Sequence, residues 1–162
     1  MSSTTEQALH RTMVATFEEL GLIVPDVALS PTQLASRVDA AVSVAFRGPL
    51  SGRLVLRASS AILLELVTNM LGSDEAHDSS MQHDALGELA NVICGNLLPQ
   101  VAGLNTVFVL SAPQWYDDLK NNSEGCTVKA SASVGVGDGK AIADLVLFGE
   151  GTHTAEFRVA AA

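Results

Sequence analysis

Residues 84–100 read DALGELANVICGNLLPQ, an apolar helical pattern that contains an acid and an amide three residues apart. Because successive residues of an α-helix are turned by about 100°, the polar and small positions of this stretch gather in one narrow wedge. These positions are Asp84, Glu88, Asn91 and Gly95. The opposite side carries Leu86, Leu89, Ile93 and Leu97. We therefore expect a helix with one face in the core and a polar stripe turned outward.

The polar stripe combines groups that suit contact with a partner. A carboxylate such as Glu88 binds cations, and an amide such as Asn91 both donates and accepts hydrogen bonds, so it can hold a water molecule. Gly95 on the same stripe lets another backbone approach closely. An ordinary solvated helix face is the alternative, because a Glu-x-x-Asn spacing arises by chance in roughly one chain in three of this size. The spacing alone leaves both interpretations open.

The composition favours a single globular domain. The chain has 162 residues, of which 48% are hydrophobic and 17% are charged, and this length is enough to bury one substantial aliphatic core. We therefore expect residues 1–162 to form one domain. The formal net charge of −9 disfavours binding to nucleic acids or anionic membranes. It suits a protein that meets basic patches on a partner protein.

Neither a disulfide framework nor secretion is indicated. Cys94 and Cys126 lack the paired spacing of zinc sites and disulfide-rich domains, which fits a reducing compartment. The amino terminus shows no basic region followed by an apolar stretch, and no apolar run is long enough to span a bilayer. We expect a cytoplasmic protein with Cys94 near its core.

Cap and stop signals delimit the helices. We expect helices at about Glu6–Leu20 and Ala61–Leu71, in addition to the long helix that contains residues 84–100. The capping signals are Ser3 with Glu6, Ser59 or Ser60, and Ser79 with Gln82, and the stop signals are Gly21 and Gly72. Pro99 lacks an amide proton, so the long helix should kink or end near it.

Alternation of apolar and polar residues predicts an antiparallel sheet. The expected strands are Val38–Arg47, Arg53–Ala58, Thr106–Ser111, Cys126–Val136 and Lys140–Phe148. Glycine-rich turns at residues 48–52 and 137–139 join the first two and the last two strands as hairpins. Arg53 and Arg57 should face water. Runs of strands broken by helices indicate an α+β fold, with long helices packed on one face of a mainly antiparallel sheet.

The segment Leu86–Asn96 reads LGELANVICGN and follows the expected strand hairpin and a short glycine-ended helix, with Asp84 four residues before Glu88. In this arrangement nearly the whole chain resembles the CheX-type chemotaxis phosphatases of the CheC/CheX/FliY family. Pro113 lies one position short of the place where the family pattern has a proline. CheC-like members usually carry two Glu-x-x-Asn sites, whereas this chain carries one, so the resemblance is to CheX.

The resemblance implies a CheC/CheX-like domain that hydrolyses the aspartyl phosphate of a CheY-like receiver domain. In that role Glu88 and Asn91 are the candidate catalytic residues: Asn91 would orient the attacking water, and Glu88 would pair with a lysine of the receiver. The receiver would bring Mg²⁺, so no cofactor or metal site of the chain's own is expected. Asp84 and Gly95 are candidate partner-binding residues, although an acid at position 84 can equally favour the helix dipole. Asn96 turns toward the apolar flank, so a structural role is expected for it.

The resemblance also implies a homodimer joined partly through its sheets, which agrees with the tendency of exposed edge strands to pair. The alternative function is a non-catalytic CheX-like module that binds a receiver domain, or another signalling or flagellar partner, through the same helix. The intact pair of Glu88 and Asn91 favours the enzyme.

Other candidate sites are less convincing. The glycine-rich run 135–141 lacks the length and the Ser or Thr of a phosphate-binding loop, and it is more typical of a hairpin turn. His77 and His83, with their neighbouring acids, lack the four-residue spacing of a helical zinc pair. Trp115 and Tyr116 could form a binding edge, although aromatic residues after a strand are more often packed against the core or rim.

Overall fold

The predicted long helix forms as α4 (Ser79–Ala102) in the computed structural model of the chain. The structure describes residues 3–72, 78–117 and 125–149. The apolar face of α4 is fully buried, as its period predicts. Its buried side chains include Leu86, Leu89, Ile93, Cys94 and Leu97.

Both ends of α4 differ slightly from the prediction. The cap is Asp78, one residue before the predicted Ser79, because its side chain accepts a hydrogen bond from the Met81 amide at 2.9 Å. At the other end the helix continues past Pro99, and the Gly103 amide then donates to the Pro99 carbonyl. The proline therefore does not end the helix at once, and termination comes within the next turn.

The strands form one antiparallel sheet in the order β3-β1-β2-β6-β5, and β4 pairs with β1 on the same edge as β3. They are β1 (Ala40–Arg47), β2 (Gly52–Ala58), β3 (Val109–Leu110), β4 (Gln114–Trp115), β5 (Cys126–Val136) and β6 (Gly139–Phe148). The two predicted hairpins, β1–β2 and β5–β6, are confirmed. Gly137 in the second turn has a φ of 57°, a left-handed conformation that favours glycine.

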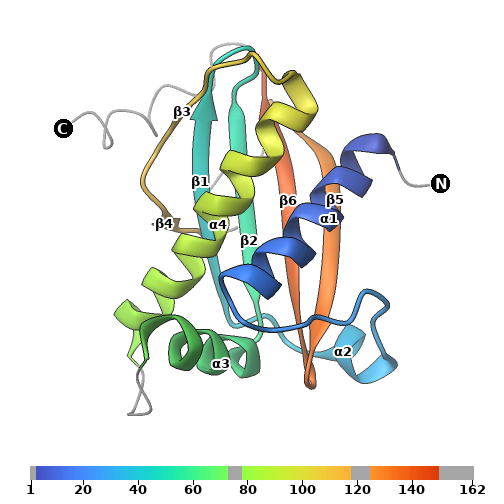
Figure 1. Ribbon diagram of the computed structural model, residues 1–162, viewed down its shortest axis with the longest axis vertical. Helices are drawn as coiled ribbons and strands as arrows, with labels where there is room; N and C mark the ends of the chain where they lie inside the picture. The colour runs from blue at the N-terminus through green and yellow to red at the C-terminus, as the bar shows by residue number, and fades with distance from the viewer. Residues whose placement is uncertain (1–2, 73–77, 118–124, 150–162) are drawn as a thin grey trace.

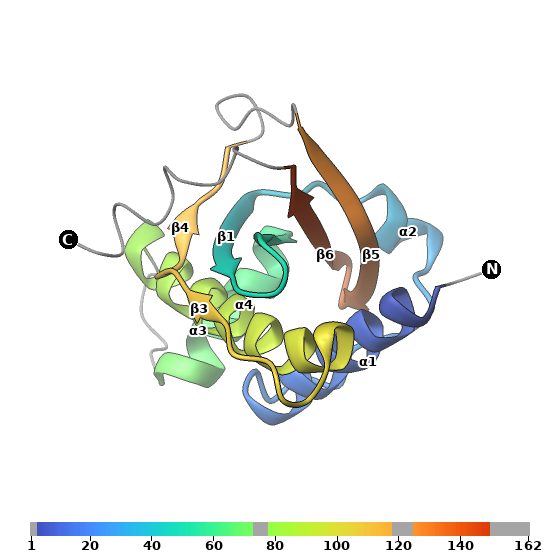
Figure 2. The ribbon, with the colours of Figure 1, turned by 90° about the horizontal axis from the view of Figure 1, so that it is seen from above.

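The main helices lie on one face of this sheet, as predicted. Figure 1 shows α4 side by side with α1 (Thr4–Glu19) across the front of the sheet and α3 (Ser60–Leu71) at its lower end. The view from above in Figure 2 puts α1 and α4 on the same side of the curved strands. The predicted α+β fold with helices on one face of an antiparallel sheet is therefore confirmed.

The core lies between α1, α3 and α4 on one side and the inner face of the sheet on the other. Alternate residues of β1 and β2 point inward, as the period of two requires. The largest fully buried side chains outside α4 are Leu9, Met13, Phe17, Phe46, Leu54, Leu56, Ile62, Leu63 and Leu66.

The prediction that Arg53 and Arg57 face water was wrong. Arg53 is only 7% exposed, and its guanidinium lies 4.8 Å from the ring centroid of Phe148. Arg57 is half-buried and donates to the Asp144 carboxylate at 2.6 Å. Both guanidinium groups also lie 5.6 Å from the ring centroid of Tyr116. Alternation placed these arginines correctly on the outer face of the sheet, but aromatic side chains from distant segments cover that face.

Two short elements also depart from the prediction. The loop before β1 contains α2 (Pro31–Ala35), whose capping box is formed by Ser30 and Gln33. Gln33 is buried and its amide donates to the Asp26 carboxylate and to the Gly137 carbonyl, which holds α2 against the β5–β6 turn. The strand expected at residues 106–111 is reduced to the two residues of β3.

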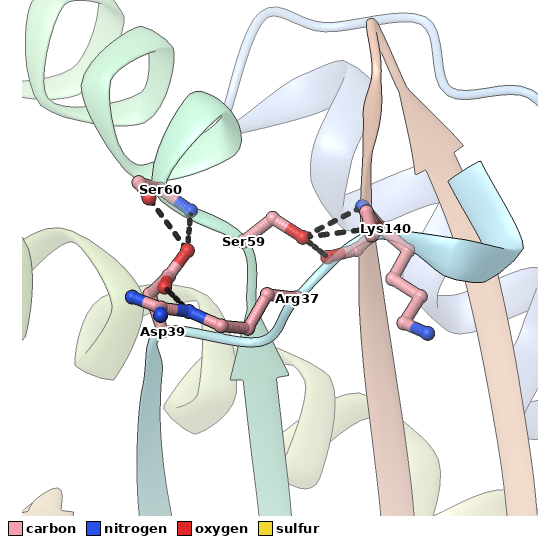
Figure 3. Close-up of polar contacts among 6 residues, drawn as sticks. Arg37, Asp39, Ser59, Ser60 and Lys140 are labelled. Atoms are coloured by element: carbon pink, nitrogen blue, oxygen red, sulfur yellow. Dashed lines mark hydrogen bonds and ion pairs between the residues drawn. The ribbon is translucent and has the colours of Figure 1, made fainter. Parts of the chain in front are cut away.

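The amino terminus of α3 is held by a residue that precedes β1. Ser59 stands at the N-cap position, but its hydroxyl accepts a hydrogen bond from the Lys140 amide and makes no cap bond. Asp39 takes over the capping role, since its carboxylate accepts from both the amide and the hydroxyl of Ser60 and also from Arg37 (Figure 3). These bonds, with Ser60 first, lower the pKa of Asp39 from 3.8 to about 2.

We predict that Asp39→Ala lowers the free energy of unfolding at neutral pH by about 1 kcal/mol, as loss of a helix cap does. Because the pKa of Asp39 is lower in the folded state, its contribution is fully present above its ordinary pKa of 3.8 and disappears as the pH falls through about 2. Urea unfolding of both proteins at several pH values should show the difference shrinking over that interval. Glu65→Ala, which removes an exposed carboxylate from the same helix, is the matched control. A difference that stays constant down to the lowest pH would contradict the assignment.

Candidate functional site

The structure brings the four residues of the predicted stripe together on the outer face of α4. Asp84, Glu88 and Gly95 are exposed and Asn91 is half-buried, while the leucines and isoleucine opposite them are fully buried. At a rise of 1.5 Å per residue, the stripe spans about 16 Å, and Glu88 and Asn91 are separated by about 4.5 Å along the axis. One small partner surface can therefore contact both side chains.

The Glu88 carboxylate and the Asn91 amide are free to meet a partner. Within the three described ranges, no hydrogen bond or ion pair holds either side chain. This distinguishes them from other polar side chains of the fold, such as Gln33, whose amide is used for packing. A carboxylate and an amide on a rigid helix, both without partners among the described residues, can pair with a cation and orient a water molecule.

A shallow depression lies beside the amino-terminal half of the stripe. It has a volume of about 380 Å³ and is lined by His83, Asp84, Gly87, Glu88 and Pro113. A Cβ atom at position 87 would lie only 2.8 Å from the Cβ of Pro113, so the proline ring occupies the space that this glycine leaves open. The helical period indicated neither Gly87 nor Pro113 as part of the site, because their contact depends on the pairing of β4 with β1.

The carboxyl-terminal half of the stripe has no neighbouring segment of the described ranges packed on it, unlike the half in which Pro113 contacts Gly87. A Cβ atom at Gly95 would meet no atom within 4 Å. Pro99 lies four residues later and has no amide proton, so the Gly95 carbonyl lacks its usual helical donor. Gly95 thus offers an accessible backbone and an exposed acceptor on the same face as Asn91.

Asn96 lies outside the stripe, but the structure differs from the expectation that it turns toward the apolar flank. It is exposed and lines a groove of about 340 Å³ between α1 and α4. Gln100 crosses this groove, donating to the Thr12 hydroxyl and to the Asn96 carbonyl. A larger depression of about 510 Å³ lies beside α1 and β5, away from the stripe. The groove has its acid, Glu19, and its amides on different helices, whereas the larger depression is lined by Glu6 and Gln7 from one turn of α1.

Other chemistries find little support in the described part of the chain. It contains no group of three or more His, Cys, Asp or Glu side chains that could hold a metal ion, and His77 lies outside the described residues. Asp78 caps α4, and His83 packs against Trp115. Burial raises the pKa of Cys94 to about 12, so its thiol is not an activated nucleophile. Among the described helices, none is both long and apolar enough to cross a membrane.

Residues 40–134, more than half of the chain, match a family model described as chemotaxis phosphatase CheX. The chain belongs to the CheX family. The matched segment contains the whole stripe on α4 and the segment with Pro113. Membership confirms the resemblance of the sequence to the CheX-type chemotaxis phosphatases. No curated protein matches the chain.

Solved structures share the CheX fold. The chemotaxis protein CheX from Vibrio vulnificus matches with a TM-score of 0.68 and 16% identity, over 90% of this chain and 97% of that one. CheX from Desulfovibrio desulfuricans matches with a TM-score of 0.68 and 14% identity, over 90% of this chain and 99% of that one. The CheX-CheY-BeF3-Mg²⁺ complex from Borrelia burgdorferi matches with a TM-score of 0.59 and 15% identity, over 89% of this chain and 97% of that one. Because the identities are this low, these structural matches show that the chain has the same fold and nothing more.

The two glycines of α4 should respond oppositely to the same substitution. We predict that Gly87→Ala lowers the free energy of unfolding by about 1–3 kcal/mol, because the new methyl group would collide with Pro113. Gly95→Ala, placed in open space on the same helix, should raise it by up to about 1 kcal/mol through better helix propensity. Urea unfolding followed by circular dichroism measures both. Equal stability of the two variants would rule out the tight contact between α4 and Pro113.

Proposed function

We propose that this CheX-family chain is a phosphatase that hydrolyses the aspartyl phosphate of a CheY-like receiver domain and so ends a chemotaxis or two-component signal in the cytoplasm. The observation that supports this most is the pair formed by the exposed Glu88 and the half-buried Asn91, which have no internal partners in the described ranges and face outward on a rigid helix. The family and the fold agree with this role.

Asn91 is the proposed catalytic residue. An acyl phosphate is already a reactive electrophile, so its hydrolysis needs mainly a water held in line with the bond that breaks. The Asn91 amide can accept a hydrogen bond from that water and donate another, which fixes the direction of its lone pair. The water oxygen then bonds to phosphorus, the bond between phosphorus and the aspartyl oxygen breaks to leave the carboxylate, and both protons of the water leave with the phosphate.

Glu88 is proposed to fix the position of the helix on the receiver. Its carboxylate can pair with a lysine beside the phosphorylated aspartate, and such a charge-assisted hydrogen bond sets both distance and register. The receiver supplies Mg²⁺ for charge stabilisation, and the proposal gives this chain no cofactor of its own. The Borrelia complex of the same fold contains CheY, beryllofluoride and Mg²⁺ together.

Asp84 and Gly95 are proposed to contact the partner at the two ends of the stripe. Asp84 is the sixth residue of α4, beyond the first turn in which the helix dipole acts strongly, so the dipole accounts poorly for an acid here. Its exposed carboxylate instead adds negative charge next to Glu88. Gly95 permits close approach of the receiver backbone, and its carbonyl can accept a hydrogen bond from it.

The alternative is a non-catalytic CheX-like module that docks a receiver, or another signalling or flagellar partner, through the same face without accelerating hydrolysis. Both functions need Glu88, but only hydrolysis needs an amide placed to hold water. Asn91 is half-buried and its amide makes no hydrogen bond within the described residues, so it is available to hold a water molecule, which favours the enzyme.

Decay of phosphorylated CheY-like receivers of the same organism, measured with wild type and two variants, separates the two functions. Asn91→Ala should lower kcat by about 100-fold while the Kd for the receiver changes little, because the amide positions the water. Glu88→Ala should mainly raise KM, by about 10-fold or more, as loss of a charge-assisted hydrogen bond does.

The matched controls are Asn96→Ala, which removes an exposed amide from the same helix, and Glu65→Ala, which removes an exposed acid from α3. Both should keep the wild-type rate. Wild type that binds a receiver without hastening its decay would establish the non-catalytic module. An undiminished rate for Asn91→Ala would show that another residue holds the water.

We also infer that two copies of the chain associate through the outer edge of β5. This strand borders the sheet, and its exposed residues include Thr127, Val128 and Lys129. Static light scattering should give twice the mass of one chain, and Val128→Pro should return it to a monomer by disrupting backbone pairing at this edge. A wild-type protein that scatters as a single chain would contradict the dimer.

A further inference from the structure

A half-exposed tryptophan stands at the edge of the site on α4. Trp115, the one tryptophan of the sequence, is 49% exposed although it belongs to β4 and its backbone pairs with Val42 of β1. Its ring lies 4.7 Å from the ring of His83, measured between centroids, with the two planes tilted by 59°. The ring is therefore held from behind by a strand and from one side by α4, and it still presents an open face.

The same edge of the molecule holds Trp115 and the acids of the stripe. His83 directly precedes Asp84 and lies about 7.5 Å before Glu88 along the helix axis. Pro113, two residues before Trp115, packs on Gly87 and lines the depression together with Asp84 and Glu88. The depression thus joins the carboxylates of Asp84 and Glu88 to His83, whose ring contacts Trp115. Among the described residues that line it there is no lysine or arginine.

The two adjacent aromatic residues of this segment have different roles. Tyr116 is half-buried, with the guanidinium groups of Arg53 and Arg57 each 5.6 Å from its ring centroid, so its ring is engaged by the sheet. Trp115 points to the other side, where its contact is the His83 ring. The binding edge that the sequence allowed for both residues is therefore reduced to Trp115.

We propose that Trp115, supported by His83, is an anchor that selects the receiver domain by contact beside its phosphorylated aspartate. This inference rests on the proposed function. We expect the Trp115 ring to contact an apolar side chain of the receiver, next to the lysine that pairs with the acids of α4. A rigid aromatic ring loses little conformational entropy on binding, and tryptophan is enriched among the residues that dominate interface energies. Asp84 and Glu88 on the same rim add the charge that suits a basic partner surface.

The first test uses Trp115 as its own reporter. The probe is a CheY-like receiver of the same organism, loaded with Mg²⁺ and beryllofluoride, with any tryptophan of its own replaced by phenylalanine. Binding should shift the emission of Trp115 to shorter wavelength, because the exposed face of its indole becomes covered. Binding observed by anisotropy of the dye-labelled receiver with no change in this emission would overturn the proposal.

The second test separates docking from chemistry. Trp115→Ala should raise KM for the phosphorylated receiver by about 10- to 30-fold, with kcat within about twofold of wild type. Trp115→Phe should recover most of the loss, and His83→Ala should raise KM by about threefold because the ring loses its support. Leu34→Ala, which removes a 60% exposed apolar side chain from distant α2, is the control and should leave KM unchanged.

These outcomes distinguish the anchor from the phosphatase proposal. A wild-type chain that shifts its emission on binding but does not hasten decay contradicts the enzyme and supports the anchor. A chain that hastens decay normally while Trp115→Ala keeps the wild-type KM overturns the anchor and leaves the enzyme intact. If Trp115→Ala fails to fold, the emission of wild type and the KM of His83→Ala still decide the matter.

Discussion

Burial of one face of α4 fixes the direction of every residue in the candidate site. Leu86, Leu89, Ile93 and Leu97 pack without exposed surface against α1, α3 and the inner face of β1. Burial of each such side chain contributes about 1.5–3 kcal/mol, and turning the helix about its axis would expose all four to water. The helix therefore cannot rotate about its axis, and Glu88 and Asn91 must face outward at a fixed separation. A site of only two functional side chains can rely on this rigidity.

The resulting surface carries groups that can position a water molecule and a partner, but its described residues include no activated nucleophile and no metal site. Cys94 is the one cysteine of α4, and it is buried in the core with its pKa raised. The described residues hold no cluster suited to a metal ion. What the stripe offers is a carboxylate, an amide and an accessible backbone, with a rim formed by Pro113 and Trp115. Such a surface suits a substrate that is already reactive and is carried by a folded partner.

Helical and strand periods predicted the parts of this arrangement that are local. The stripe, the buried face of α4 and the strands β1, β2, β5 and β6 follow directly from residue spacing. The contacts that the spacing could not predict join distant segments. Pro113 reaches Gly87 only because β4 pairs with β1, and Arg53 is buried because Phe148 and Tyr116 cover the outer face of the sheet. Likewise, the local sequence predicted Ser59 or Ser60 as the cap of α3, but the cap is Asp39, which lies before β1.

The central claim is that the outer face of α4 meets the receiver, and amide chemical-shift mapping tests it most directly. In a titration of the labelled chain with a beryllofluoride-activated receiver, we predict that the largest shifts occur at residues 84–95 and 113–115, with little change along β5. Shifts confined to β5 or to the hollow beside α1, with the resonances of Glu88 and Asn91 unmoved, would contradict the account.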